Sequence, residues 1–106
     1  MGEVTLMSKK KPRDLEELAD ELEVVLGTMA RSLVDHPADL VIQRATNPSG
    51  FVSFEVTYRE EEFGSLVGKR GAHAEAMRAL LMAGAAARRV RVSVMFMSSQ
   101  GGTVRR

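Results

Sequence analysis

The chain has 106 residues, of which 44% are hydrophobic and 27% are charged, and it contains no cysteine. This length predicts a single domain, and the composition is that of a folded chain rather than a disordered one. The lack of cysteine excludes disulfides, zinc–thiolate sites and thiol nucleophiles. The longest apolar run, at residues 79–87, is less than half the length of a membrane-spanning helix, so no membrane span is expected.

Charge is segregated along the chain, although the formal net charge is only +1. Residues 14–64 carry three arginines against twelve acidic residues, whereas residues 65–106 carry eight basic residues against one acidic residue. A basic, arginine-rich second half favours an anionic partner, with nucleic acid as the first candidate. The alternative is that acidic and basic elements face each other within the fold.

Residues 1–13 are predicted to form a flexible basic tail, within which Met7 is an alternative natural start. A helix is predicted from residue 14 to about residue 35. Asp14 and Glu17 form a capping-box pattern, and apolar residues then recur every three or four positions from Leu15 to Leu33. This helix is expected to end before Pro37, because the residue that precedes a proline disfavours helical backbone.

Two strands are predicted next, at residues 40–46 and 51–58, joined by an Asn-Pro-Ser-Gly turn at 47–50. A short helix follows from residue 60 and ends at Gly68, and a longer alanine-rich helix runs over residues 72–87. Residues 89–97 alternate between valine or phenylalanine and polar residues, which predicts a third strand with outward-facing arginines. Residues 98–106 lack periodicity and are predicted to be a second loose tail.

The element order is therefore α-β-β-α-α-β. Three strands and three helices in this order predict a two-layer α+β domain at residues 14–97, with all three helices on one face of the sheet.

The most informative motif is Gly68, Lys69, Arg70 and Gly71, called here the 68–71 loop, which joins the two later helices. Glycines at both ends permit a tight turn and close approach of a ligand to the backbone. The N–H groups and the dipole at the start of the next helix favour an anion, and the two cations add to that preference. The spacing alone is weak evidence, because nine glycines produce such a pair by chance. The alternative is an ordinary turn with solvated side chains.

The segment Leu66-Val67-Gly68-Lys69-Arg70-Gly71 resembles the signature of the KH RNA-binding domain, and the element order is that of its type II form. More narrowly, the chain from about residue 15 to residue 96 resembles the small bacterial single-KH proteins of the KhpA family. The similarity includes the stretch 33–37, the Glu-Phe-Gly before the signature and the stretch 89–92. One departure is Ala74, where KH domains usually have a large aliphatic residue.

The resemblance implies a cytoplasmic, non-enzymatic protein that holds about four nucleotides of single-stranded RNA. It assigns RNA-backbone contacts to the 68–71 loop. It also assigns an apolar groove for the bases to Leu66, Val67 and Ala74, with the 47–50 turn as the opposite lip. His73 is a further candidate RNA contact. Arg89 and Arg91 are accessory candidates, for which ordinary solvated charge is the alternative.

The resemblance also implies a protein partner, because a single KH domain grips few nucleotides and useful affinity needs a second module. KhpA-type proteins pair with a larger KH protein, KhpB or Jag. The pair is linked to RNA-level regulation as an RNA chaperone, to cell elongation and to envelope, including peptidoglycan, homeostasis. A homodimer is the other arrangement. The competing hypothesis is a KH-shaped protein-interaction module with little RNA affinity, which Ala74 and the acidic first half suggest.

Three other sites can be set aside from the sequence. A nucleotide-binding P-loop needs four residues between its glycines and a Ser or Thr after the Lys, but residues 64–70 provide three residues and then Arg70. Consecutive glutamates at 60–62 diverge around a helix and cannot converge on one atom. His36 and His73 lack a second ligand at metal-binding spacing. No catalytic residue, metal or cofactor is therefore expected.

Overall fold

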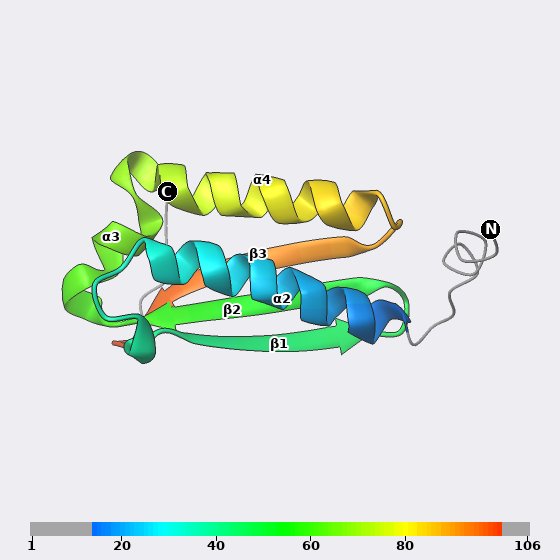
Figure 1. The fold of residues 1–106 in the computed structure, drawn as a ribbon, viewed down its shortest axis with the longest axis horizontal. Coiled ribbons are helices and arrows are strands. Elements are labelled where there is room, and N and C mark those ends of the chain that lie inside the picture. Colours follow the sequence, from blue (N-terminus) through cyan, green and yellow to red (C-terminus); the bar gives the residue numbers. More distant parts are fainter. Residues whose placement is uncertain (1–13, 101–106) are drawn as a thin grey trace.

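The computed structural model describes residues 14–100, so the tail predicted at 1–13 and most of the tail predicted at 98–106 lie outside the described residues. The element order is α-β-β-α-α-β, as predicted (Figure 1). Short 3-10 turns lie at Pro37–Asp39, Glu60–Glu62 and Lys69–Gly71. The helices and strands are α2 (Asp14–Ser32), β1 (Val41–Asn47), β2 (Phe51–Tyr58), α3 (Phe63–Val67), α4 (Ala72–Ala86) and β3 (Arg91–Ser98).

The three strands form one mixed sheet in the order β1-β2-β3. β1 and β2 are the antiparallel hairpin predicted from the turn at 47–50, with Asn47 opposite Phe51. β2 and β3 are parallel, with Phe51 opposite Arg91 and Tyr58 opposite Ser98. Parallel neighbours need a crossover connection, which α3 and α4 provide. α2 and α4 lie side by side over one face of the sheet (Figure 1), which confirms the predicted two-layer α+β class.

The hydrophobic core lies between the sheet and the two long helices. Alternate residues of β2, namely Val52, Phe54, Val56 and Tyr58, are buried against the helices, as their period-two pattern predicts. The inward positions of β3 and the apolar stripe of α2 complete this core. Val25 belongs to the predicted apolar stripe of α2 but is 39% exposed, and Leu80 on α4 is 53% exposed.

Several boundaries differ from the sequence prediction: the helix predicted from residue 60 begins as a 3-10 turn, with α3 starting at Phe63, and other ends shift by one residue. Two further differences have a local reason. The first helix ends at Ser32 rather than near residue 35, and the Leu33 N–H closes its last turn on the carbonyl of Ala30. The third strand begins at Arg91 rather than residue 89. Arg89 takes a left-handed φ of 62° and donates its N–H to Ala86, so it belongs to the turn that follows α4.

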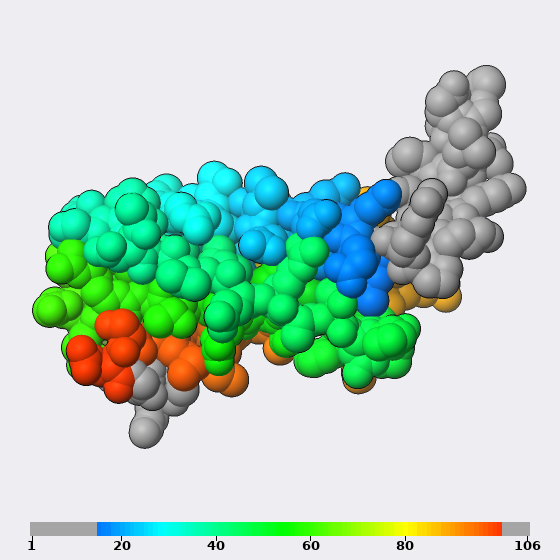
Figure 2. Space-filling model, turned by 90° about the horizontal axis from the view of Figure 1, so that it is seen from below, coloured from blue at the N-terminus to red at the C-terminus, as the bar shows by residue number. Residues whose placement is uncertain are grey.

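The acidic surface of α2 is partly neutralised by β1. Figure 2 shows α2, in blue to cyan, running beside β1. From β1, Arg44 pairs with Asp20 at 2.6 Å, with Glu23 at 3.1 Å and with Glu16 at 3.3 Å. The hydrogen bond to Asp20 is the main cause that raises the pKa of Arg44 above its ordinary value. At this face, therefore, the acidic residues meet a basic residue of the same fold, as the intramolecular alternative proposed.

Candidate nucleic-acid interface

The 68–71 loop turns the chain sharply between α3 and α4 at one end of the molecule (Figure 1). The Gly68 N–H donates to Gly64 at 2.8 Å and ends α3, and the Gly71 N–H donates to Gly68 at 2.9 Å and closes the loop. Three of the four residues have positive φ, namely Gly68 at 86°, Arg70 at 56° and Gly71 at 78°. Gly68, with ψ 167°, lies in a region that essentially only glycine occupies, and Gly71 lies in the left-handed region that glycine adopts at the lowest cost. The left-handed Arg70 was not predicted.

The two cations of the loop are free to meet a ligand. Lys69 and Arg70 are exposed, and neither forms an ion pair with any of residues 14–100. No side chain caps the first turn of α4, although its first N–H group, that of Ala72, donates to the Lys69 carbonyl. The helix dipole and the side chains therefore favour negative charge at the same place.

His73 packs against the loop from the first turn of α4. A Cβ built on Gly68 would lie 2.6 Å from Cγ of His73 and 2.7 Å from its backbone nitrogen. The His73 Nδ1 lies 3.0 Å from the carbonyl oxygen of Ser65. A carbonyl oxygen only accepts hydrogen bonds, so Nδ1 carries a hydrogen and the ring ties α4 to α3. The structure thus places this sequence candidate directly beside the loop.

The three residues expected to line an apolar groove are buried instead. Leu66 is 0%, Val67 9% and Ala74 1% exposed, and all three belong to the main core. Their side chains pack in the core on either side of the loop in the sequence, and little of their surface faces solvent.

The 47–50 turn was expected to form the opposite lip of the groove, and that expectation was wrong. The Gly50 carbonyl accepts the Arg91 N–H at 2.9 Å, so the turn lies at the start of β3, beyond the C-terminal end of α4. The 15 residues of α4 separate it from the loop by about 22 Å at the usual helical rise. Arg89 and Arg91 lie at this far end too, where the Arg91 guanidinium is 5.9 Å from the centre of the Phe51 ring.

A hydrogen-bonded group near α3 escaped the sequence analysis. The Tyr58 hydroxyl accepts the His36 backbone N–H at 3.1 Å and donates to Glu62 at 3.0 Å, and the His36 Nδ1 is 3.0 Å from the same carboxylate. The bond with His36 is the main cause that holds the pKa of Glu62 below its ordinary value, and burial raises the pKa of Tyr58. The group ties the connection after α2 to the segment that leads into α3. The available signal was Tyr58 itself, since a tyrosine on a buried strand face needs a partner for its hydroxyl.

Replacing Tyr58 with phenylalanine is expected to lower the free energy of unfolding by about 1–2 kcal/mol, because the part-buried His36 N–H loses its acceptor. Urea denaturation at pH 7 measures this difference. The lowered pKa of Glu62 stabilises the fold above its ordinary value of 4.5, and that contribution is lost as the pH falls through the folded-state pKa. The difference in free energy of unfolding between the wild type and the variant should therefore become smaller in acid. A difference that grows in acid would contradict this role for Glu62.

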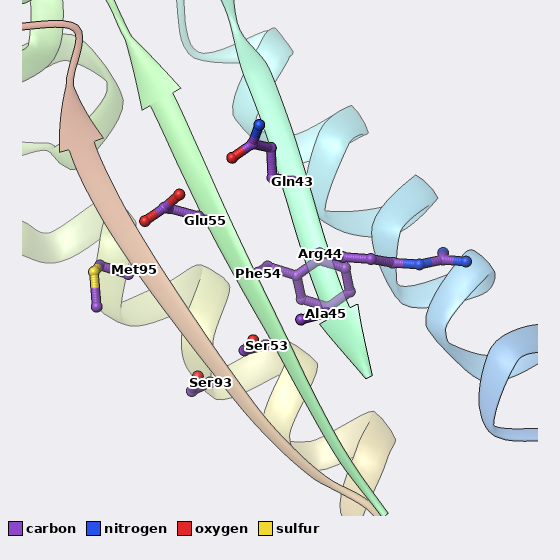
Figure 3. Close-up of a pocket in the computed structure, with 8 residues that line it drawn as sticks. All are labelled: Gln43, Arg44, Ala45, Ser53, Phe54, Glu55, Ser93 and Met95. Carbon is purple, nitrogen blue, oxygen red and sulfur yellow. The ribbon is translucent and has the colours of Figure 1, made fainter. Parts of the chain in front are cut away.

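The face of the sheet that the helices leave uncovered carries a shallow pocket (Figure 3). Its lining includes Ser53 and Glu55 of β2 and Ser93 and Met95 of β3. Arg44, although it borders the pocket, extends toward α2 and its carboxylates. With an acidic residue and no inward cation, this pocket suits a polyanion poorly.

Residues 14–100 contain neither a metal-binding cluster nor a membrane-spanning helix. No group of three or more His, Cys, Asp or Glu is arranged to hold a metal ion there. Among the helices of the same residues, none combines the length and the apolar character needed to cross a bilayer.

Comparison with known proteins gives one consistent result. A family model described as the KhpA/KhpB KH domain matches residues 23–96, which include the whole 68–71 loop. The RNA-binding protein KhpA of Leifsonia xyli subsp. xyli is 38% identical over 74 residues, covering 70% of this chain and 96% of that protein. RNA-binding protein KhpA of Clostridium acetobutylicum is 32% identical over 73 residues, covering 69% and 96%. The Listeria monocytogenes protein of the same name is 31% identical over 62 residues, covering 58% and 80%. No solved structure matches the chain with statistical significance.

Proposed function

Because the chain belongs to the KhpA/KhpB family of KH domains, we propose that it is a non-enzymatic RNA-binding protein that holds short single-stranded RNA at the 68–71 loop. The observation that carries this proposal is the loop itself, in which Lys69 and Arg70 are exposed, have no ion-pair partner among residues 14–100, and lie beside a helix start without a side-chain cap. The names of the relatives, which are RNA-binding proteins, support the same conclusion.

The loop offers two kinds of contact to an RNA backbone. Lys69 supplies a compact charge, and Arg70 supplies a planar fork that can hold two phosphate oxygens. The dipole at the start of α4 favours a phosphate at the same place. Little side-chain surface is available for contact with the bases, because Leu66, Val67 and Ala74 are buried. Tyr58 is 0% exposed as well. Affinity should therefore depend on the backbone more than on base identity.

Arg89 and Arg91 are accessory contacts in this proposal. They lie at the far end of α4, so a strand that reaches them from the loop must run the length of that helix. Replacing both arginines should weaken the binding of long oligonucleotides more than the binding of short ones.

Binding to single-stranded RNA is expected to weaken with salt. If the loop and its neighbours engage two to four phosphates, the log–log slope should be roughly −1.4 to −2.8. Duplex RNA of the same sequence should bind more weakly, because a KH domain takes unpaired nucleotides. Fluorescence anisotropy with a labelled oligonucleotide across a salt series measures both quantities. A much steeper slope, with duplex and single strand bound equally, would indicate a diffuse cationic surface and contradict the proposal.

The proposal extends to partners and cellular role. A larger KH protein of KhpB/Jag type, or a second copy of this chain, would supply further RNA contacts. The exposed apolar side chains of the helix layer, with Val24 67% and Leu80 53% exposed, support a protein contact there. Acting in the cytoplasm as an RNA chaperone or post-transcriptional regulator, such a pair would serve cell elongation and envelope homeostasis.

Light scattering distinguishes an 11.6 kDa monomer from a dimer. A well-folded chain that binds such a partner but no RNA would favour the protein-interaction alternative.

A further inference from the structure

The third strand leaves one edge of the sheet open. β3 pairs with β2 on one side, and no other strand of residues 14–100 pairs with it on the other side. The Arg91 N–H donates to Gly50, and the Ser99 N–H also donates toward β2. In a parallel ladder every second residue of a strand bonds the same neighbour, so the even-numbered residues of β3 direct their backbone groups away from β2. The backbone N–H and C=O groups of Val92, Val94 and Phe96 are called here the β3 edge.

The composition of this strand favours pairing with a further strand. Residues 92–97 read Val-Ser-Val-Met-Phe-Met and contain no charge, proline or glycine. Short, uncharged segments of this kind pair with other chains when they lie at an open sheet edge. A second copy of this chain fits the β3 edge, because two identical edges can pair antiparallel about a two-fold axis. The register centred on Val94 places Val92 opposite Phe96 and matches each edge group with a partner.

A side chain from α4 occupies the middle of this edge. The Arg78 Nε donates to the Val94 carbonyl at 3.0 Å. The Arg78 guanidinium also lies 5.3 Å from the centre of the Phe96 ring, which is a cation–π distance. These two contacts hold a positive charge beside the centre of the β3 edge. If two copies paired in the register centred on Val94, their two Arg78 side chains would meet near the two-fold axis and repel each other.

We infer that Arg78 closes the β3 edge against strand pairing with a second copy of this chain. A strand that paired there would displace the Arg78 Nε from the Val94 carbonyl, so one charge-assisted hydrogen bond would be lost. It would also desolvate a cation that has no carboxylate partner within residues 14–100. This role is independent of RNA binding, and it concerns a different surface from the helix layer.

The test compares the full wild-type chain with Arg78→Leu, which removes both the charge and the donor. Sedimentation velocity over a concentration series measures self-association. The variant should associate about tenfold more strongly or more, the equivalent of one charge-assisted contact. Arg88→Leu is the matched control, because it removes the same charge from the end of α4. Arg88 pairs with Glu21 at 3.9 Å and not with β3, so this control should behave as the wild type does.

Two further measurements identify the surface that associates. Amide hydrogen exchange followed by NMR should show protection of Val94 and Phe96 that grows with concentration in Arg78→Leu but not in the wild type. Adding Ser93→Lys and Met95→Lys to Arg78→Leu should abolish the added association. Both positions are exposed, and the register centred on Val94 places them directly opposite each other, where like charges are destabilising.

Arg78→Gln repeats the test if thermal melting shows that Arg78→Leu is destabilised, because it removes the charge and keeps a polar side chain. An Arg78 variant that associates no more than the wild type, with unchanged exchange at Val94 and Phe96, would overturn the inference. Association that Ser93→Lys and Met95→Lys fail to reverse would overturn it too, since another surface would then be responsible. Protection of the same two amides in the concentrated wild type would show that Arg78 leaves the edge open.

Discussion

Changing Lys69 and Arg70 together to aspartate should abolish binding to single-stranded RNA while circular dichroism and thermal melting stay nearly unchanged. The loss should be about 100-fold or more, because two charge-assisted contacts disappear and two carboxylates then repel the phosphates. Both side chains are exposed and form no ion pair within the described part of the chain, so the free energy of unfolding should fall by only about 0.5 kcal/mol or less. Aspartate also accepts the left-handed backbone of residue 70, where φ is 56°.

A matched control is available at the other end of α4. Changing Arg88 and Arg89 to aspartate alters the net charge by the same amount, and Arg89 also has a left-handed φ, of 62°. This control should weaken RNA binding by about tenfold or less, because Arg89 is only an accessory contact and Arg88 already pairs with Glu21 at 3.9 Å. Equal losses from the two pairs would mean that total charge, and not the loop, determines binding. Unfolding of the Lys69 and Arg70 variant would mean that the loop side chains are structural.

Gly68→Ala should lower the free energy of unfolding by about 3 kcal/mol, the largest effect on stability expected here. Gly68 has φ 86° and ψ 167°, a region that essentially only glycine occupies. The new Cβ would also lie 2.7 Å from the backbone nitrogen of His73, which cannot move without displacing the start of α4. Urea denaturation followed by circular dichroism measures the change.

Gly64→Ala is the control for this substitution. Gly64 lies in α3, four residues before Gly68, and a Cβ there meets nothing within 4 Å. That variant should be as stable as the wild type or up to about 1 kcal/mol more stable, because alanine restricts the unfolded chain. If Gly68→Ala proved equally stable, the loop would be free to relax and its geometry would not require glycine. Since glycine substitutions disturb the fold, the charge reversal is the better probe of RNA contact.

The features that local pattern controls were predictable from the sequence. The alternation of Val52, Phe54, Val56 and Tyr58 correctly predicted both a strand and its buried face. The turn at 47–50 correctly predicted the hairpin, and the glycines of the 68–71 loop correctly marked a sharp turn between two helices. In each of these, the signal lies within a few consecutive residues, and tertiary contacts reinforce it.

The features that the sequence did not show depend on how distant segments meet. The 47–50 turn begins β2, and β2 runs parallel to β3, so the turn must lie where α4 ends rather than where it starts. Leu66 and Ala74 fit the loop signature equally well as groove or as core, and only packing places them in the core. Arg44 forms hydrogen bonds with α2 residues more than twenty positions away, and no local sequence pattern predicts that pairing.

The most direct test of RNA binding at the loop is an amide NMR titration of the 15N-labelled chain with a short single-stranded RNA. The largest shifts should fall on Gly68, Lys69, Arg70, Gly71 and the first turn of α4, where the dipole favours a phosphate. Residues of the uncovered sheet face, such as Ser53 and Ser93, should not move. Shifts confined to that face or to residues 88–91, with the loop unchanged, would contradict the proposal that the 68–71 loop holds the RNA.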